Sequence, residues 1–186
     1  MKKQLKLSDF RPKLPFNINY GMADIEISRV LKYPEDYQFD FDVFLPSKNK
    51  NLQRPLVWSL LQKQELILSI LKGVILPPIT ILQKAERDVK KSIYKVIDGK
   101  QRICTIISFI EGEFPIIVDG TEYYFGDLSK DMKFEIGGGG RGYLRSNIGY
   151  EYWNNPISDD ILIQWFEMIN FAGTPQDKEH LENLKK

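Results

Sequence analysis

An apolar strand pattern that runs directly into an amphipathic helix is the strongest constraint on how this chain folds. Residues 93–97 (Ile-Tyr-Lys-Val-Ile) are rich in the β-branched and aromatic side chains typical of a strand, and Asp98 follows without a loop. A helix is predicted next, because apolar residues recur with helical spacing up to Gly112, which ends the pattern. The apolar face of this helix consists of Ile103, Ile106, Ile107 and Ile110. Residues 98–102 (Asp-Gly-Lys-Gln-Arg) therefore lie where a strand ends and a helix begins.

The rest of the chain contains further strand and helix patterns. Strands are predicted over residues 39–44, 79–82, 115–118 and 122–125, the last two as a hairpin that turns at Asp119-Gly120. Helices are predicted over residues 59–72, 159–170 and 176–184, and polar loops over residues 46–51 and 84–91. Since no repeat or domain linker separates them, we expect one α+β domain over residues 18–186 with a helical C-terminal part, preceded by a basic arm over residues 1–17.

Composition agrees with a single folded domain and excludes several classes of site. With 186 residues, of which 42% are hydrophobic and 12% aromatic, the chain is large enough to bury one core. Its 26 Lys and Arg residues nearly balance 25 Asp and Glu residues, so bulk charge does not hold the protein on DNA. One cysteine and one histidine exclude an internal disulfide and a histidine-rich zinc site.

The sequence also indicates a compartment. No apolar run approaches the ~20 residues that a membrane-spanning helix needs. The charged start, Met1 to Lys3, is not followed by the apolar segment of a signal peptide. We therefore expect a protein of the reducing cytoplasm that has no contact with membranes.

Residues 98–102 have the chemistry of an anion-binding site. The first turn of a helix leaves backbone N–H groups unpaired and carries the positive end of the helix dipole. Gly99 lets the backbone approach a ligand, while Lys100 and Arg102 add two positive charges. The carboxylate of Asp98 is suited to a hydrated magnesium ion or to a water molecule.

A structural interpretation of the same residues is equally open at this point. Asp98 and Gln101 have the spacing of a capping box, in which each side chain accepts a hydrogen bond from a backbone N–H at the helix start. Gly99 would then only relax the turn. These five residues by themselves do not decide between a helix cap and a binding site.

Several motifs in a family-specific order favour the binding site. Residues 98–102 are similar to an Asp-Gly-Gln-Gln-Arg signature, and residues 53–58 (Gln-Arg-Pro-Leu-Val-Trp) to an upstream Gln-Arg-x-x-x-Trp box. Residues 166–174 resemble a downstream Phe-x-x-Ile-Asn-x-x-Gly-Thr segment. The chain therefore resembles, over roughly residues 50–180, the N-terminal domain of GmrSD-type modification-dependent restriction enzymes, within the ParB/sulfiredoxin-like superfamily. Between these boxes, residues 64–65, 69–73 and 76–79 also follow the order of the family.

This resemblance implies a ParB-like mixed sheet with packed helices, whose signature loop binds a nucleoside triphosphate. In related phage-defence proteins the domain also hydrolyses the nucleotide. Carried over by position, Asp98 binds Mg²⁺ or the attacking water, and Gln101 positions that water. The expected nucleotide-binding residues are Arg54, Gly99, Lys100 and Arg102, and the expected catalytic residues are Asp98, Gln101 and Arg102.

Two features depart from the family pattern. Lys100 stands where the signature has glutamine, which adds a charge and removes an amide acceptor. The companion nuclease domain of the family carries a His-Asn-His metal site, which a chain with one histidine cannot contain. We therefore expect no DNA cleavage by this chain alone, and a separate nuclease subunit as its partner.

Two functions remain open. The first is a magnesium-dependent NTPase that acts as the sensor or regulatory half of a modification-dependent restriction or phage-defence system. The second is a non-catalytic, ParB-like regulatory module that is gated by nucleotide or binds DNA, and homo-oligomers are compatible with both. DNA binding through the basic arm and the glycine-rich loop at residues 137–141 is a third interpretation with less support.

Three single residues are predicted to be structural. Trp58 is expected to pack beneath the loop that carries Arg54 rather than to stack on a base. Cys104 is expected to be a small packing residue of its helix, and His180 a solvated surface residue.

Overall fold

A computed structural model describes residues 20–85, 91–137, 144–152 and 156–171. In chain order the elements are β1 (Tyr20–Ile25), α2 (Ile27–Lys32), β2 (Tyr37–Asp40), β3 (Phe44–Leu45), β4 (Lys50–Asn51), α3 (Leu60–Leu71), β5 (Ile79–Ala85), β6 (Ser92–Asp98), α4 (Lys100–Ile110), β7 (Ile116–Val118), β8 (Thr121–Tyr123), the 3-10 helix η1 (Phe125–Asp127), α5 (Lys130–Gly137), β9 (Leu144–Tyr152) and α6 (Asp159–Phe171). The predicted basic arm, most of the glycine-rich loop, the centre of the loop at 84–91 and the predicted helix at 176–184 lie outside the described residues.

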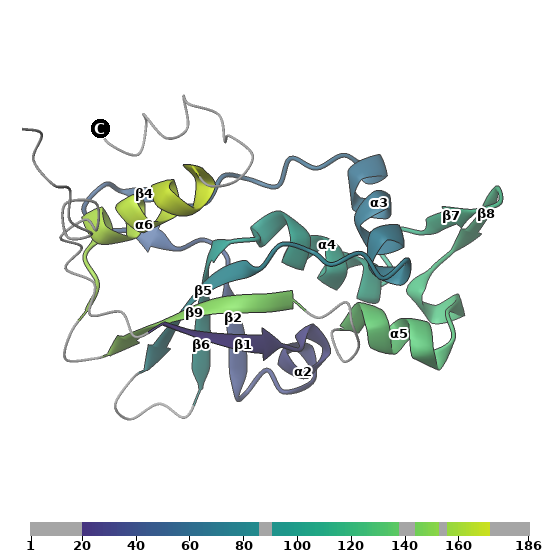
Figure 1. Ribbon diagram of the computed structural model, residues 1–186, viewed down its shortest axis with the longest axis horizontal. Helices are drawn as coiled ribbons and strands as arrows, with labels where there is room; N and C mark the ends of the chain where they lie inside the picture. The colour runs from purple at the N-terminus through teal and green to yellow at the C-terminus, as the bar shows by residue number, and fades with distance from the viewer. Residues whose placement is uncertain (1–19, 86–90, 138–143, 153–155, 172–186) are drawn as a thin grey trace, which may run out of the picture.

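Five strands form one mixed sheet in the order β1-β9-β5-β6-β2 (Figure 1). β9 runs antiparallel to β1 and parallel to β5, while β6 runs antiparallel to β5 and parallel to β2. β7 and β8 form a separate hairpin around Asp119 and Gly120, as predicted, and β3 and β4 form a second small antiparallel pair. Together with five helices among the described residues, this arrangement confirms the α+β class.

The central strands are buried on both faces. Successive side chains along a strand point to opposite sides, so neighbouring residues enter two different cores. Ile81 of β5 and Val96 of β6 belong to a core that α2, α3, α4 and α5 also line. Leu82 and Ile97, the next residues along each strand, belong to a second core with Phe166 of α6. In Figure 1, α6 lies beside β4 at one end of the molecule, whereas α3, α5 and the β7–β8 hairpin lie at the other.

The predicted helices begin and end at capping residues. α3 starts after Ser59, whose hydroxyl accepts the N–H of Gln62 at 3.3 Å while the Gln62 amide accepts the N–H of Ser59 at 2.9 Å. Gly73 and Gly112, both with positive φ, follow α3 and α4. The helix predictions over residues 59–72 and 159–170 are thus confirmed to within one residue at each end. Among the described helices, none has the length and apolar character that crossing a membrane requires.

The strand predicted over residues 39–44 is wrong beyond Asp40. Oδ1 of Asp40 accepts the backbone N–H groups of Asp42 at 3.1 Å and of Val43 at 3.2 Å, and this side-chain turn ends β2. Val43 has a positive φ of 21° and is buried in the core beside α6. The alternating pattern of the sequence therefore covers two short strands, β2 and β3, with a turn between them.

Gly99 joins β6 to α4 in a backbone conformation that other residues rarely adopt. Its φ is +102°, and it is the N-cap residue of α4. It also lies against β5, because a Cβ at this position would overlap Cγ2 of the fully buried Ile79. Backbone conformation and packing therefore both require glycine, and together they fix the direction in which α4 leaves the sheet.

Replacing this glycine is expected to destabilise the fold strongly. Gly99→Ala combines left-handed strain with a clash in the core, so we expect the free energy of unfolding to fall by about 2–4 kcal/mol. Gly112→Ala, at the other end of α4, is the matched control, because its φ is also positive but no atom lies within 4 Å of the added Cβ. It is expected to cost about 1 kcal/mol. If Gly99→Ala and Gly112→Ala lower the free energy of unfolding in urea equally, the packing of Gly99 against Ile79 does not require glycine.

Candidate functional site

Asp98 and Gln101 do not cap α4, so the capping-box interpretation is wrong. The N-cap residue is Gly99, and no side chain caps the first turn. Asp98 is the last residue of β6, and its Oδ2 accepts a hydrogen bond from Nη2 of Arg102 at 3.0 Å. The backbone N–H groups of Lys100, Gln101 and Arg102 consequently have no acceptor among the described residues.

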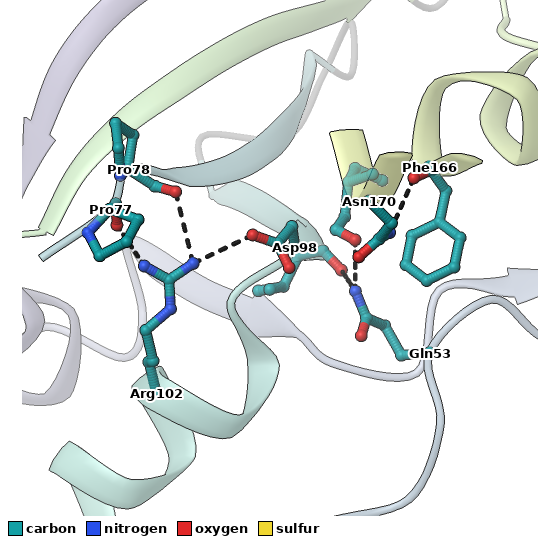
Figure 2. A network of polar contacts seen from close by, with 9 residues as sticks. Gln53, Pro77, Pro78, Asp98, Arg102, Phe166 and Asn170 are labelled. Carbon is teal, nitrogen blue, oxygen red and sulfur yellow. Dashed lines mark hydrogen bonds and ion pairs between the residues drawn. The ribbon is translucent and has the colours of Figure 1, made fainter. Parts of the chain in front are cut away.

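A buried glutamine fastens the chain before α3 to the end of β6. Nε2 of Gln53 donates to the carbonyl oxygens of Val96, at 3.0 Å, and of Ile97 (Figure 2). The side chain of Gln53 is buried, so these bonds are made where water does not replace them. Gln53 therefore fixes the beginning of residues 53–58, which we call the Arg54 loop.

The side chain of Gln101 fastens the other end of the Arg54 loop. Its Nε2 donates to the carbonyl oxygen of Pro55 at 2.9 Å. Its Oε1 accepts the N–H groups of Val57 at 3.1 Å and of Trp58 at 3.4 Å. The amide thus uses both its ends on the protein backbone. Arg54 lies between these two fastenings, and its guanidinium makes no hydrogen bond or ion pair with a described residue.

A small hollow lies between the Arg54 loop and the first turn of α4. Its volume is about 130 Å³. It is lined by Gln53, Arg54, Trp58, Asp98, Gly99, Lys100, Gln101 and Arg102. All six site residues predicted from the sequence are therefore brought together at one place. Three of the lining side chains are cationic and one is a carboxylate, so the hollow has a net positive charge.

Arg102 is committed to the protein's own structure (Figure 2). Its Nη1 donates to the carbonyl oxygen of Pro77, and its Nη2 to that of Pro78 at 3.3 Å and to Asp98. Burial lowers the pKa of Arg102, while the neighbouring Asp98 carboxylate opposes this shift. Arg102 thereby joins α4 to the segment that leads into β5, which competes with its predicted role at a phosphate.

Lys100 lines the hollow, but its ammonium group already has a partner. Nζ of Lys100 lies 3.2 Å from Oδ1 of Asp42, in the turn that follows β2. The side chain of Lys100 is 11% exposed and that of Asp42 is 74% exposed. The positive charge of Lys100 is therefore balanced by a carboxylate at the surface.

The sequence indicated the lining residues but not the partners that hold them. Gln53 is the first residue of the Gln-Arg-x-x-x-Trp box and stands next to Arg54. An amide side chain at this position was the signal that could have indicated its hydrogen bonds to the backbone of β6. Asp42 and Pro77 are remote in sequence from the residues they contact, and no spacing rule connects them. Trp58 packs against the main core while it lines the hollow, in agreement with its predicted packing role.

The donor set at the hollow suits a magnesium ion only in company with phosphate. Within the described part of the chain, no three Asp, Glu, His or Cys residues are grouped so as to hold a metal ion. Asp98 is the one carboxylate among the described residues that line the hollow. Its Oδ2 is bound to Arg102, whereas its Oδ1 has no bond to another described residue. Mg²⁺ accepts one carboxylate oxygen when phosphate oxygens and waters complete its shell. Asp98 thus fits an ion that arrives with a nucleotide.

One comparison with known proteins gave a match. The model of the family described as "GmrSD restriction endonuclease, N-terminal domain" matches residues 41–185, which include the Arg54 loop and the β6–α4 junction. No curated protein and no solved structure matches the chain. The relation to the ParB/sulfiredoxin-like superfamily accordingly stays a prediction.

The two arginines of the hollow are expected to differ in their effect on stability. Arg102→Ala removes the donor for two carbonyl groups and leaves Asp98 unpaired, so the free energy of unfolding should fall by about 2–3 kcal/mol. Arg54→Ala removes no such bond and should change it by less than about 0.5 kcal/mol. Urea unfolding of both variants measures the difference. A large loss for Arg54→Ala would show that the Arg54 loop depends on this side chain.

Cys104 is expected to react slowly in the folded protein. Burial raises the pKa of its thiol to about 11, and the thiolate is the nucleophilic form. Alkylation by iodoacetamide at pH 8 should therefore be slow for the native protein and fast after unfolding in urea. Mass spectrometry of the alkylated fraction over time checks this, and equal rates would contradict the predicted packing role of Cys104.

Proposed function

Because the chain belongs to the family of GmrSD restriction endonuclease N-terminal domains, we propose that it is the nucleoside-triphosphate-binding part of a restriction system. The phosphates bind at the amino end of α4. The observation that carries this proposal is the first turn of α4: its three N–H groups lack an acceptor among the described residues, and the residues that carry them line a positively charged hollow. Unpaired N–H groups and the helix dipole favour an anion at such a position.

Arg54 is the side chain best placed to bind the phosphates. It lines the hollow without a partner among the described residues, so binding a ligand breaks no ion pair with any of them. A guanidinium group can bind two phosphate oxygens at once. The two glutamine clamps hold the Arg54 loop in place before the ligand arrives, which reduces the entropy lost on binding.

The size of the hollow limits which part of the nucleotide it holds. About 130 Å³ is small beside the ~300–1,000 Å³ of pockets that enclose whole ligands. The hollow therefore takes phosphoryl groups, while ribose and base lie outside. Leu56 and Val57 of the Arg54 loop are 52% and 58% exposed and offer an apolar surface next to it. Contacts of this kind do not read the base closely, so the identity of the nucleotide depends on other parts of the chain.

Hydrolysis is the second candidate function, and Oδ1 of Asp98 favours it. This oxygen has no bond to another described residue and belongs to a residue that lines the hollow, so it can either bind the magnesium ion or accept a hydrogen bond from the water that attacks the γ-phosphorus. A magnesium ion bound with the nucleotide supplies charge neutralisation of the phosphates. Gln101 acts differently from the sequence-based expectation: its amide holds the Arg54 loop, so it positions Arg54 rather than the water.

We assign the remaining steps of restriction to other components. The 186 residues contain one histidine and do not supply a His-Asn-His nuclease site, so we assign DNA cleavage to a nuclease that lies outside them, such as a separate subunit. Nucleotide binding at α4 then serves as the sensor or regulatory step. If no phosphate is released, the same site serves a nucleotide-gated, ParB-like module, with DNA or a second copy of the chain as its partner.

Calorimetric titration with ATP, GTP, CTP and UTP in the presence of Mg²⁺ tests the proposal. We expect at least one triphosphate to bind, and Arg54→Ala to weaken its affinity about 10- to 100-fold through the loss of charge-assisted hydrogen bonds. Lys72→Ala, which removes an exposed cation at the far end of α3, is the control and should bind normally. Phosphate release, measured in parallel, separates an NTPase from a binding module. If none of the four triphosphates binds, the proposal is wrong.

A further inference from the structure

The ion pair between Lys100 and Asp42 lies at the edge of the proposed phosphate site. Lys100 follows Gly99 in the first turn of α4 and lines the hollow, whereas Asp42 does not line it. Their charged atoms, Nζ and Oδ1, are 3.2 Å apart. The pair thus joins a cation of the site to a carboxylate that the site itself does not use.

The position of Asp42 is fixed by its backbone and not by its side chain. Its N–H is bound by Oδ1 of Asp40, and the next residue, Val43, is buried at 1% exposure. The carboxylate of Asp42 is 74% exposed and makes its only ion pair among the described residues with Lys100. The turn therefore holds a negative charge beside the hollow whether or not Lys100 remains bound to it.

We propose that Asp42 sets the affinity of this site by competing with phosphate for Lys100. This inference rests on the proposed function, because it concerns the same ligand. In the ligand-free protein Asp42 holds the ammonium group of Lys100. A bound phosphate attracts the same group, and the Asp42 carboxylate then faces the ligand as an unpaired like charge. Binding is consequently weaker than the three cations of the hollow would give without Asp42.

The proposal predicts a gain of affinity on removing a charge. Asp42→Asn keeps the backbone N–H that Asp40 binds but removes the competing carboxylate, so triphosphate affinity should rise about two- to fivefold, as expected for an exposed ion pair. The gain should be smaller for a nucleoside monophosphate, whose charge is lower. In the background of Lys100→Gln, where no ammonium group is present, Asp42→Asn should keep only the smaller part of its gain, which comes from removing the like charge beside the ligand.

The control is Asp36→Asn, which makes the same change of charge at the opposite end of β2. Asp36 is exposed and precedes the strand, whereas Asp42 follows it. Its substitution should leave the affinity unchanged. If Asp36→Asn and Asp42→Asn raise the triphosphate affinity equally, the effect comes from net charge alone and the proposal is wrong.

Calorimetric titration of a triphosphate into the unmodified full chain and these variants, with Mg²⁺ at constant ionic strength, separates the outcomes. If the unmodified protein binds and Asp42→Asn gains more affinity with Lys100 than with Lys100→Gln, the competition is supported. If the unmodified protein binds but Asp42→Asn gains nothing, or gains equally with Lys100→Gln, the competition is wrong while the proposed function stands. If no variant binds any triphosphate, the proposed function fails and the competition fails with it.

Discussion

The close approach of Gly99 to the buried Ile79 determines how β6 connects to α4, and the candidate site depends on this connection. With φ at +102°, the backbone leaves β6 and enters α4 without a side chain in between, and the helix axis is set by this step. From that direction Gln101 reaches the Arg54 loop and Arg102 reaches the carbonyl group of Pro77. Because the N-cap is glycine, no side chain covers the first-turn N–H groups. Gln101 and Arg102 thus use their side chains on the protein's own backbone, and the first-turn N–H groups have no acceptor among the described residues.

The sequence could predict the parts of the fold whose pattern is local. The strand at 93–97, the helices α3 and α4 and the hairpin around Asp119 follow from periodicity, capping and turn chemistry over short windows. β9 was not predictable in this way: it carries Ser146, Asn147 and Gly149, yet lies between β1 and β5 in the sheet. Its pairing depends on long-range contacts that no window contains. β1 and the helices α2 and α5 were likewise not predicted from the sequence.

For the candidate site, the sequence indicated which residues gather but not what each one does. Asp98 and Gln101 have capping-box spacing, but the helix starts one residue later than that motif requires, with Gly99 as its N-cap. A difference of one residue is below what a sequence pattern resolves. The same limit applies to the two arginines, since Arg102 is bound by Pro77, Pro78 and Asp98, whereas the guanidinium of Arg54 has no partner among the described residues.

The central claim, that a nucleoside triphosphate binds through the backbone at the amino end of α4, is tested most directly by solution NMR. In a titration of ¹⁵N-labelled protein with a triphosphate and Mg²⁺, the account predicts that the amide signals of Lys100, Gln101 and Arg102 shift and saturate together with the side-chain N–H signal of Arg54. Amide N–H groups that gain a phosphate acceptor change their resonance strongly. Saturable shifts confined to other regions, or no shifts at all, would contradict the account.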